Sequence, residues 1–389
     1  MIKQSVHRRL LLPVYLPAML LGIPAQASLV LLPLYVLYLG GSPAAAASII
    51  GVRAVGMMSM DIPAGMLAAR YGDKTLMLLA SAAIALSHTA FALSKEFWLL
   101  YVIAFFYGAG GSSFLLGRMS YLTDTLDNAE RGRVIAMIAG SMRASALIGP
   151  FVGALLAQHF GYDSAFFIGA VLAAGSWFCI KYFAVTENQT QEFVPLRKVA
   201  KIAQQHARVF ATAGIGAVLF MLLRSARTVM VPLIGADLGL DTQTIGLIVS
   251  ISAAVDVALF YPAGLIMDRR GRRATAVPSS ILFTIALALL ATAEGFSSLL
   301  VIAIFLGFAN GLSTGIVMTL GTDLAPTNQR AGFLGIWRLL TDFGTSAGPL
   351  VVGAIVASAP LGAAALSVGA IGAVGCVVVY RYVEETLAR

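Results

Sequence analysis

Nine ionisable side chains lie inside long apolar segments of the sequence, where a charge is costly. They are Arg53, Asp61, Arg118, Arg143, Arg224, Arg227, Asp256, Arg338 and Asp342. On insertion scales such a residue costs roughly 2.5–3.5 kcal/mol at the membrane centre, so it is expected to face a cavity or a partner. The arginines in this set outnumber the acids, and a cavity with surplus positive charge attracts carboxylate or phosphate groups. The alternative is a structural ion pair or a side chain that reaches its helix end, and it is strongest for Arg118 and Arg227.

The segments that carry these residues are long enough to be membrane helices. The chain is 59% hydrophobic and 11% charged, whereas a soluble domain has about 45–50% and 25%. A span needs about 20 apolar residues. Division at charged residues, Gly and Pro gives twelve spans: 10–38, 46–68, 75–94, 98–123, 134–157, 164–184, 209–235, 243–267, 274–293, 298–322, 333–356 and 361–381. The expected fold class is an all-α membrane protein.

The two halves of the sequence repeat one another at an offset of 199 residues. Without a gap, this offset superposes Pro33 on Pro232, Gly72 on Gly271, and Gly149-Pro150 on Gly348-Pro349. We therefore expect two pseudo-symmetric six-helix bundles, residues 1–184 and 209–389, joined by a linker at 185–208. Two like halves around a central site are typical of secondary transporters.

The distribution of basic residues predicts the orientation. The net charge is +8, and nineteen of the 26 Lys and Arg fall in segments that would share one side of the membrane, with only Lys95 opposite. This is the positive-inside bias, so both termini are expected in the cytoplasm and no nucleic-acid partner is expected. A signal peptide ending near Ala25-Gln26-Ala27 is the alternative for the N-terminus. The repeat argues against it, because this segment is the counterpart of residues 209–235.

Two loops carry a related pattern. One reads Gly-Met-Leu-Ala-Ala-Arg-Tyr-Gly-Asp-Lys over 65–74, and the other reads Gly-Leu-Ile-Met-Asp-Arg-Arg-Gly-Arg-Arg over 264–273. They resemble the signature loop of the major facilitator superfamily, G-x-L-x-D-R-x-G-R-R/K. The second loop matches well, whereas Ala69 replaces the acid and Asp73 the base in the first. The resemblance implies carboxylate–arginine pairs across helix ends that close the cytoplasmic side. A generic basic loop is the alternative.

Because Ala69 removes one acid of this lock, we expect Asp61 and Arg338 to pair as a substitute gate. They lie about 12 Å and 9 Å from the cytoplasmic ends of the second and eleventh helices, which pack together in this superfamily. Further gating residues are expected at the loops, namely Arg70, Asp124, Asp268, Arg269 and Asp323.

The fifth helix carries Gly149-Pro150 and Gly153. It resembles the G-x8-G-x3-G-P-x2-G motif of twelve-helix drug:proton antiporters, although Ala136 and Ser145 replace the first two glycines. Close packing at the domain interface is the alternative reading of these small residues. Such exporters usually have an arginine before the glycines of the fourth helix. Here Ala104 lies near that place, so this arginine is missing.

The resemblance implies that the first, fourth, seventh and tenth helices line the transport cavity. The expected substrate-binding residues are Arg224, Arg53, Gln26, Tyr107, Ser113, Asn310 and Arg143. Arg224 has no evident acidic partner at its depth, which favours contact with an anion. The expected proton-coupling residues are Asp256 and Asp342, with Arg143 within reach of Asp256 across the domain boundary. His88 is expected to be packed or hydrogen-bonded rather than a proton carrier.

These patterns favour a transporter over an enzyme. The sequence contains no H-E-x-x-H, P-loop or C-x-x-C motif, so no metal or other cofactor is expected. We expect a monomeric multi-pass protein of the plasma membrane, such as a bacterial inner membrane. The preferred function is proton-coupled export of a small organic molecule, and the arginines favour an anionic substrate. The alternatives are an importer or facilitator of an organic carboxylate or phosphate, and a membrane receptor that does not transport.

Overall fold

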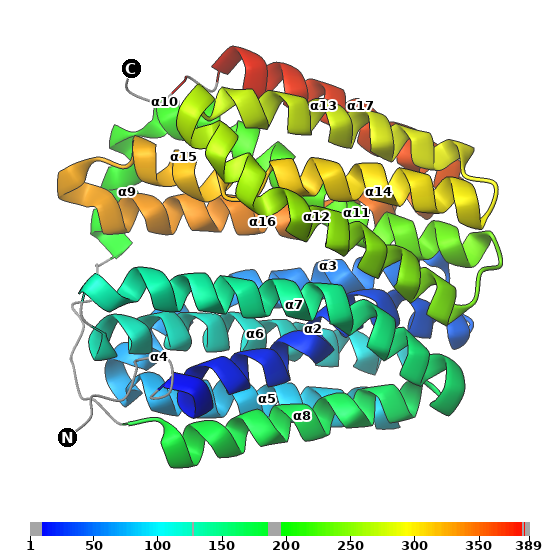
Figure 1. Cartoon of the computed structure of the whole chain (residues 1–389), viewed down its shortest axis with the longest axis horizontal. Helices are drawn as coiled ribbons and strands as arrows, with labels where there is room; N and C mark the ends of the chain where they lie inside the picture. The colour runs from blue at the N-terminus through cyan, green and yellow to red at the C-terminus, as the bar shows by residue number, and fades with distance from the viewer. Residues whose placement is uncertain (1–9, 127, 186–195, 383–384, 386–389) are drawn as a thin grey trace. The chain divides into compact units, whose positions relative to one another are not determined.

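The computed structural model of the chain describes residues 10–126, 128–185, 196–382 and 385. Within these ranges it does not describe the side chains of residues 124, 128, 129, 131, 196–198 and 331. All regular secondary structure in the described part is helical (Figure 1). The expected fold class is confirmed. The helices form two compact units, Met1–Tyr35 with Val52–Phe193, and Val36–Gly51 with Val194–Arg389.

The helices of the first half follow one another through short turns. They are a π-helical turn η1 (Leu11–Tyr15) that continues into α2 (Leu16–Tyr38), then α3 (Pro43–Ser59), α4 (Pro63–Tyr71), α5 (Asp73–Leu93), α6 (Phe97–Thr125), α7 (Asn128–Phe160) and α8 (Tyr162–Phe183). Helix α5 packs against both α6 and α8.

The second half repeats this order after a short linker helix. Its elements are α9 (Leu196–Gln205), α10 (Ala207–Val209), η2 (Phe210–Gly214), α11 (Ile215–Asp237), α12 (Thr242–Arg270), α13 (Arg273–Leu289), η3 (Leu290–Thr292), α14 (Phe296–Leu312), α15 (Ile316–Leu324), η4 (Thr327–Gln329), α16 (Arg330–Val356) and α17 (Leu361–Tyr382). Helix α13 packs against α14 and α17, as α5 does against α6 and α8. The repeat in the sequence is therefore a repeat of packing.

Eleven of the described helices are long and apolar enough to cross a membrane, and the pair α3 and α4 makes a twelfth span bent by 47°. The bend lies at Met60–Ile62, directly before Pro63. Because Pro63 has no backbone N–H, the helix loses a hydrogen bond there. Pro262, the equivalent residue, lies inside the continuous helix α12, so a proline alone does not determine the bend.

The predicted span 298–322 is also interrupted, between residues 312 and 316. Helix α14 ends at Leu312 and α15 begins at Ile316, with Gly315 in the left-handed region at φ 83°. Glycine adopts this conformation without the steric penalty that other residues have. Each half thus contains one interrupted helix, the second helix in the first half and the fourth helix in the second half.

The Gly-Pro motif packs helices within each half. A Cβ on Gly149 of α7 would lie 2.6 Å from the Ile23 carbonyl oxygen of α2. A Cβ on Gly348 of α16 would lie 2.5 Å from the Leu222 carbonyl oxygen of α11. These glycines therefore bring the fifth helix of each half against the first helix of the same half. The alternative reading, close packing at the domain interface, does not describe these contacts.

The C-terminal part of the predicted linker belongs to the second unit. Ile202 of α9 is buried in a cluster with Phe333 and Trp337 of α16, and His206 lies 3.2 Å from the Gln329 side-chain oxygen. Residues 186–195 lie outside the described part. The domain limits at 184 and 209 stay a prediction.

Candidate functional site

The first unit contains a cavity of about 210 Å³. Its lining follows one face of α2 and one face of α6, since residues three, four, seven and eight positions apart lie on the same side of a helix. The lining residues are Ala18, Leu21, Gly22, Ala25 and Gln26 of α2; Tyr107, Gly111, Phe114, Leu115 and Arg118 of α6; Arg53 and Met57 of α3; Ile84 of α5; and Met142 and Ser145 of α7.

Arg53 is held against α6 by the close approach of two backbones. A Cβ on Gly108 would lie 1.8 Å from the Arg53 carbonyl oxygen, so only glycine fits there. The guanidinium carbon of Arg53 lies 5.2 Å from the centre of the Tyr107 ring, within the range of a cation–π contact. Its Nε is buried without a hydrogen-bond partner. The Arg53 side chain is thus positioned but incompletely satisfied.

Tyr107 is positioned in turn by His88. The two rings meet edge to face with centroids 4.9 Å apart. His88 is 1% exposed; its Nδ1 lies 3.1 Å from the Ile84 carbonyl oxygen and its Nε2 lies 3.4 Å from the Ser28 hydroxyl. His88 is therefore packed and hydrogen-bonded. The Tyr107 hydroxyl is buried and forms no hydrogen bond of good geometry, although it interacts with the side chains of Ser28 and Arg53.

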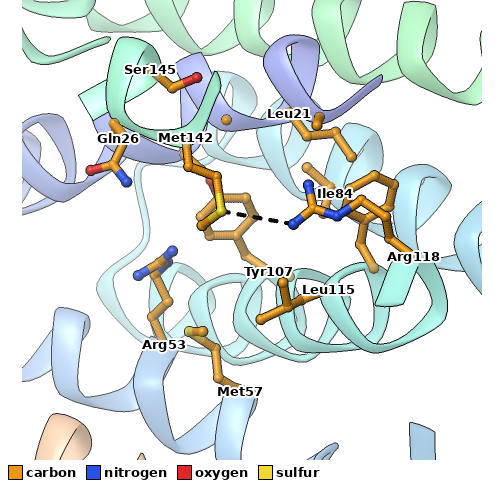
Figure 2. A pocket seen from close by; sticks show the side chains of 15 residues that line it. Leu21, Gln26, Arg53, Met57, Ile84, Tyr107, Leu115, Arg118, Met142 and Ser145 are labelled. Atoms are coloured by element: carbon orange, nitrogen blue, oxygen red, sulfur yellow. Dashed lines mark hydrogen bonds between the residues drawn. The ribbon is translucent and has the colours of Figure 1, made fainter. Parts of the chain in front are cut away.

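Arg118 enters the same cavity from the far part of the α6 face. Figure 2 shows Arg53 and Arg118 entering from two helices, with Tyr107 and Met142 between them. Arg118 is 3% exposed. One of its terminal nitrogens lies 3.8 Å from the Met142 sulfur, its guanidinium lies 5.6 Å from the Phe114 ring centre, and its Nε has no partner.

The cavity lining contains no carboxylate. In the part of the chain that the structure describes, neither Arg53 nor Arg118 forms an ion pair. Two guanidinium groups therefore share a largely apolar cavity whose lining residues supply no countercharge.

The second unit has a different polar cluster, centred on Asp256 of α12. Asn310 donates to one carboxylate oxygen at 2.6 Å, and Thr314 lies 3.5 Å from the other. The Asp256 carboxylate also interacts electrostatically with Arg224 and Arg227. The expectation that Arg224 lacks an acidic partner is therefore wrong. Arg227 additionally donates to the Leu306 carbonyl oxygen at 3.2 Å.

The expected gate residues have partners within their own units. Ser112 donates to Asp61 at 2.9 Å, and Arg338 pairs with Asp342 one helical turn away at 3.4 Å. Asp61 and Arg338 belong to different units, and their pairing stays a prediction.

At the second signature loop, Gly271 ends α12 with φ 96°. Asp323 forms an ion pair with Arg272 at 2.8 Å. Asp268 and Arg269 are exposed. The backbone N–H groups of Arg272 and Arg273 donate to the Glu385 carboxylate at 2.9 and 3.0 Å, a contact that the sequence analysis missed.

The first signature loop has a simpler arrangement. Gly72 ends α4 with φ 81°, and Lys74 donates to the Ala184 carbonyl oxygen at the end of α8 at 2.6 Å. Arg70 is exposed and stacks on Tyr71 at 5.2 Å. The side chain of Asp124, another expected gate residue, lies outside the described part.

Four of the seven expected substrate-binding residues do not line the cavity. Arg224 and Asn310 belong to the cluster around Asp256 in the second unit. Ser113 donates to the Ala109 carbonyl oxygen of its own helix at 2.8 Å. Arg143 of α7 is adjacent to the lining residue Met142, and it donates to the Ala139 carbonyl oxygen at 3.4 Å. By contrast, Arg53, Gln26 and Tyr107 lie together in the lining.

Residues 311–315 read Gly-Leu-Ser-Thr-Gly and so fit the G-x-S-x-G pattern of hydrolase nucleophiles, which was overlooked when enzyme motifs were excluded from the sequence. That pattern functions at a turn between a strand and a helix. Here it spans the break between two helices, and the Ser313 hydroxyl donates to the Asn310 carbonyl oxygen at 2.6 Å. Its geometry is that of a helix end rather than of a nucleophile.

Comparison with known proteins places this architecture in one family. The sequence model described as Major Facilitator Superfamily matches residues 14–223 and, separately, 213–389. The chain is 24% identical to the multidrug resistance protein MdtH of Yersinia pestis (strain Pestoides F) over 298 residues, 75% of this chain and 72% of that protein.

Solved structures show the same fold. A crystal structure of the nucleoside transporter NupG superposes with a TM-score of 0.80 at 15% identity, over 97% of this chain and 100% of that chain. A POT family transporter in complex with 5-aminolevulinic acid gives 0.79 at 12% identity, over 96% and 95%.

Proposed function

The chain belongs to the Major Facilitator Superfamily, and from this premise we propose that it exports a small organic anion by alternating access, in exchange for protons. Membership in the superfamily makes it a multi-pass membrane transporter. The substrate class, the coupling ion and the direction are the parts that we propose.

The anionic substrate rests mainly on one observation, the incompletely satisfied guanidinium of Arg53 in a cavity without a carboxylate. A buried guanidinium without a countercharge is unfavourable. An anion bound by two parallel hydrogen bonds would use the fork of N–H groups that the protein leaves open. Gln26 and the Tyr107 hydroxyl line the same cavity and can add neutral hydrogen bonds.

Coupling is assigned to Asp256 and Asp342, each of which lies beside an arginine. A proton-coupled transporter needs a carboxylate whose charge depends on whether the substrate is bound. Exchange requires that the substrate and the proton exclude one another, so substrate binding should drive the release of a proton from Asp256 or Asp342. Asn310 would orient the Asp256 carboxylate through its hydrogen bond.

The gate is assigned to Asp61 and Arg338, supported by the loop residues Arg70, Asp124, Asp268, Arg269 and Asp323. In the proposed gate, Asp61 leaves Ser112 and Arg338 leaves Asp342. Asp61 and Arg338 then pair with each other. Charge reversal at both positions should then restore transport that either single reversal abolishes. Normal transport in both single variants would eliminate this gate.

Export is supported by the relative MdtH, whose name describes it as a multidrug resistance protein. The same relative supports placement in a bacterial inner membrane. The concentration of basic residues on one side supports cytoplasmic termini. We propose a monomer, with the lipid bilayer and a small-molecule substrate as its partners.

The proposal can be tested with purified protein in proteoliposomes and naphthalenesulfonate, whose charge does not change with pH. An outwardly directed proton gradient should drive uptake by inside-out protein. If Asp256 or Asp342 carries the coupling proton, its variant (D256N or D342N) should lose gradient-driven uptake and retain substrate exchange. Gradient dependence that is unchanged in both variants would exclude these carriers and favour a facilitator. Binding without any transport would identify a receptor.

A further inference from the structure

Arg118 has an environment that the proposed transport of one anionic group does not explain. It is 3% exposed in the first unit, and it lies seven residues before the end of α6 at Thr125. A side chain that reached toward the helix end would bring its charge to water. Instead, the guanidinium points into the cavity, toward Met142 (Figure 2).

The contacts of Arg118 are weak for a buried cation. A guanidinium has five N–H donors. In the described part of the chain, its only hydrogen-bond acceptor is the thioether sulfur of Met142 at 3.8 Å, and thioether sulfur is a weak acceptor. The Nε is buried without a partner. A ligand oxygen could therefore displace Met142, whose flexible side chain can adopt another rotamer at little cost.

The two arginines are separated along the cavity by an apolar wall. Arg53 stacks on Tyr107, and Arg118 lies eleven residues further along the same helix, about 16 Å of helix rise. On α6 the lining residues between Tyr107 and Arg118 are Gly111, Phe114 and Leu115, none of which has a polar side chain. Such a wall fits a hydrocarbon linker better than a continuous polar molecule.

We propose that this cavity binds an organic dianion, with one acidic group at Arg53, the other at Arg118, and an apolar linker between them. This inference rests on the proposed transport of an anion and deepens it. Mono-anions occupy the Arg53 end alone. Dianions with a very short linker cannot reach both guanidinium groups.

The test compares alkane monosulfonates with α,ω-alkanedisulfonates, from ethane to octane, as ligands of the detergent-purified full-length protein. Isothermal titration calorimetry gives the dissociation constants. The variants are R118Q and R118K, with R133Q as the matched control because Arg133 is an exposed arginine of the same unit. R53Q serves as the reference for the first anion site.

The disulfonate of fitting length should bind at least tenfold more tightly than the monosulfonate of the same chain length. R118Q should remove this advantage while monosulfonate binding at Arg53 persists, which also shows that the variant is folded. R118K should retain part of the advantage, because lysine keeps the charge but loses the fork.

Equal affinity for mono- and disulfonates in the wild type would overturn the dianion inference, as would an advantage that persists in R118Q. In both cases, monosulfonate binding that depends on Arg53 would leave the proposed anion transport intact. If no sulfonate binds at all, both the inference and the proposed function are wrong.

Discussion

Gly108 and Gly307 occupy equivalent positions in the two halves, 199 residues apart. Both allow a helix backbone to approach so closely that a Cβ would lie 1.8 Å from the Arg53 carbonyl oxygen in one half and 2.3 Å from that of Ser252 in the other. The residue under each glycine is again equivalent, but its chemistry differs. Ser252 donates to the Ala303 carbonyl oxygen at 2.6 Å, whereas Arg53 brings an unneutralised charge into a cavity.

The same divergence appears around the two polar sites. Asp256, Arg224 and Asn310 of the second half correspond to Met57, Ala25 and Gly111, which line the cavity of the first half. The second unit therefore contains an acid for its arginines, while the first-unit cavity has arginines and no acid. The two halves have the same helix packing but different charges. A bound anion would supply the negative charge that the first-unit cavity lacks.

The largest expected effect distinguishes these two charge arrangements. D256N removes the acid beside Arg224 and Arg227, and it should lower the free energy of unfolding by about 3 kcal/mol, since a buried charge then loses its partner. R53Q should leave stability unchanged or raise it. Thermal unfolding in one detergent at one scan rate compares the variants, with D237N as a control at an exposed acid. Destabilisation by R53Q as large as by D256N would show that Arg53 is already neutralised.

The shared packing should fail equally in both halves. G108A and G307A should each lower stability by about 1–3 kcal/mol through overpacking. Only G108A should also weaken naphthalenesulfonate binding, because it displaces the backbone of Arg53. A Cβ on Gly175 would lie 3.6 Å from the nearest atom, in Leu20. G175A therefore adds a methyl group without overpacking and serves as the control. Equal weakening of naphthalenesulfonate binding by G307A and G108A would contradict the assignment of anion binding to the first half.

The smallest effect concerns two equivalent helix caps. Ser42 accepts from the Ala45 N–H at 3.2 Å, and Asp241 accepts from the Thr244 N–H at 2.9 Å. S42A and D241A should each cost about 1 kcal/mol. The hydrogen bonds from the Thr244 side chain and backbone hold the pKa of Asp241 below its ordinary value.

The contribution of Asp241 should therefore be complete above the unfolded-state pKa and disappear as the pH falls through the lower native pKa. Unfolding midpoints measured between pH 3 and pH 7 should show a D241A deficit that shrinks on acidification, and an S42A deficit that does not change. A constant deficit in both variants would contradict the pKa shift.

Much of the fold could be predicted from the sequence, because apolar length and a regular repeat determine helix number and order. The turn glycines Gly72 and Gly271 were identified for the same reason, since both repeat in register. The helix breaks were not predicted. Pro63 interrupts its span and Pro262 does not, so the outcome depends on packing around the proline rather than on the proline itself.

Side-chain partners were harder to predict than side-chain depth. Gln26 and Tyr107 could be placed at the cavity because the first and fourth helices were expected to line it. Arg53 lies on the second helix, whose backbone approaches α6 closely at Gly108. The electrostatic interaction between Asp256 and Arg224 depends on the rotation of α12 and α11 about their axes, which hydropathy does not specify. Arg118 was undervalued because its nearness to a helix end suggested exposure, whereas the face it shares with Tyr107, Gly111 and Leu115 could have indicated a cavity residue.

The most direct test of the account is calorimetric titration of the wild type and R53Q with naphthalenesulfonate and with the matched cation naphthylmethylammonium. The wild type is expected to bind the sulfonate in preference to the ammonium ion. R53Q should weaken sulfonate binding about tenfold, equivalent to 1.4 kcal/mol. Tighter binding of the ammonium ion, or sulfonate affinity that is unchanged in R53Q, would contradict the assignment of this cavity to an anion.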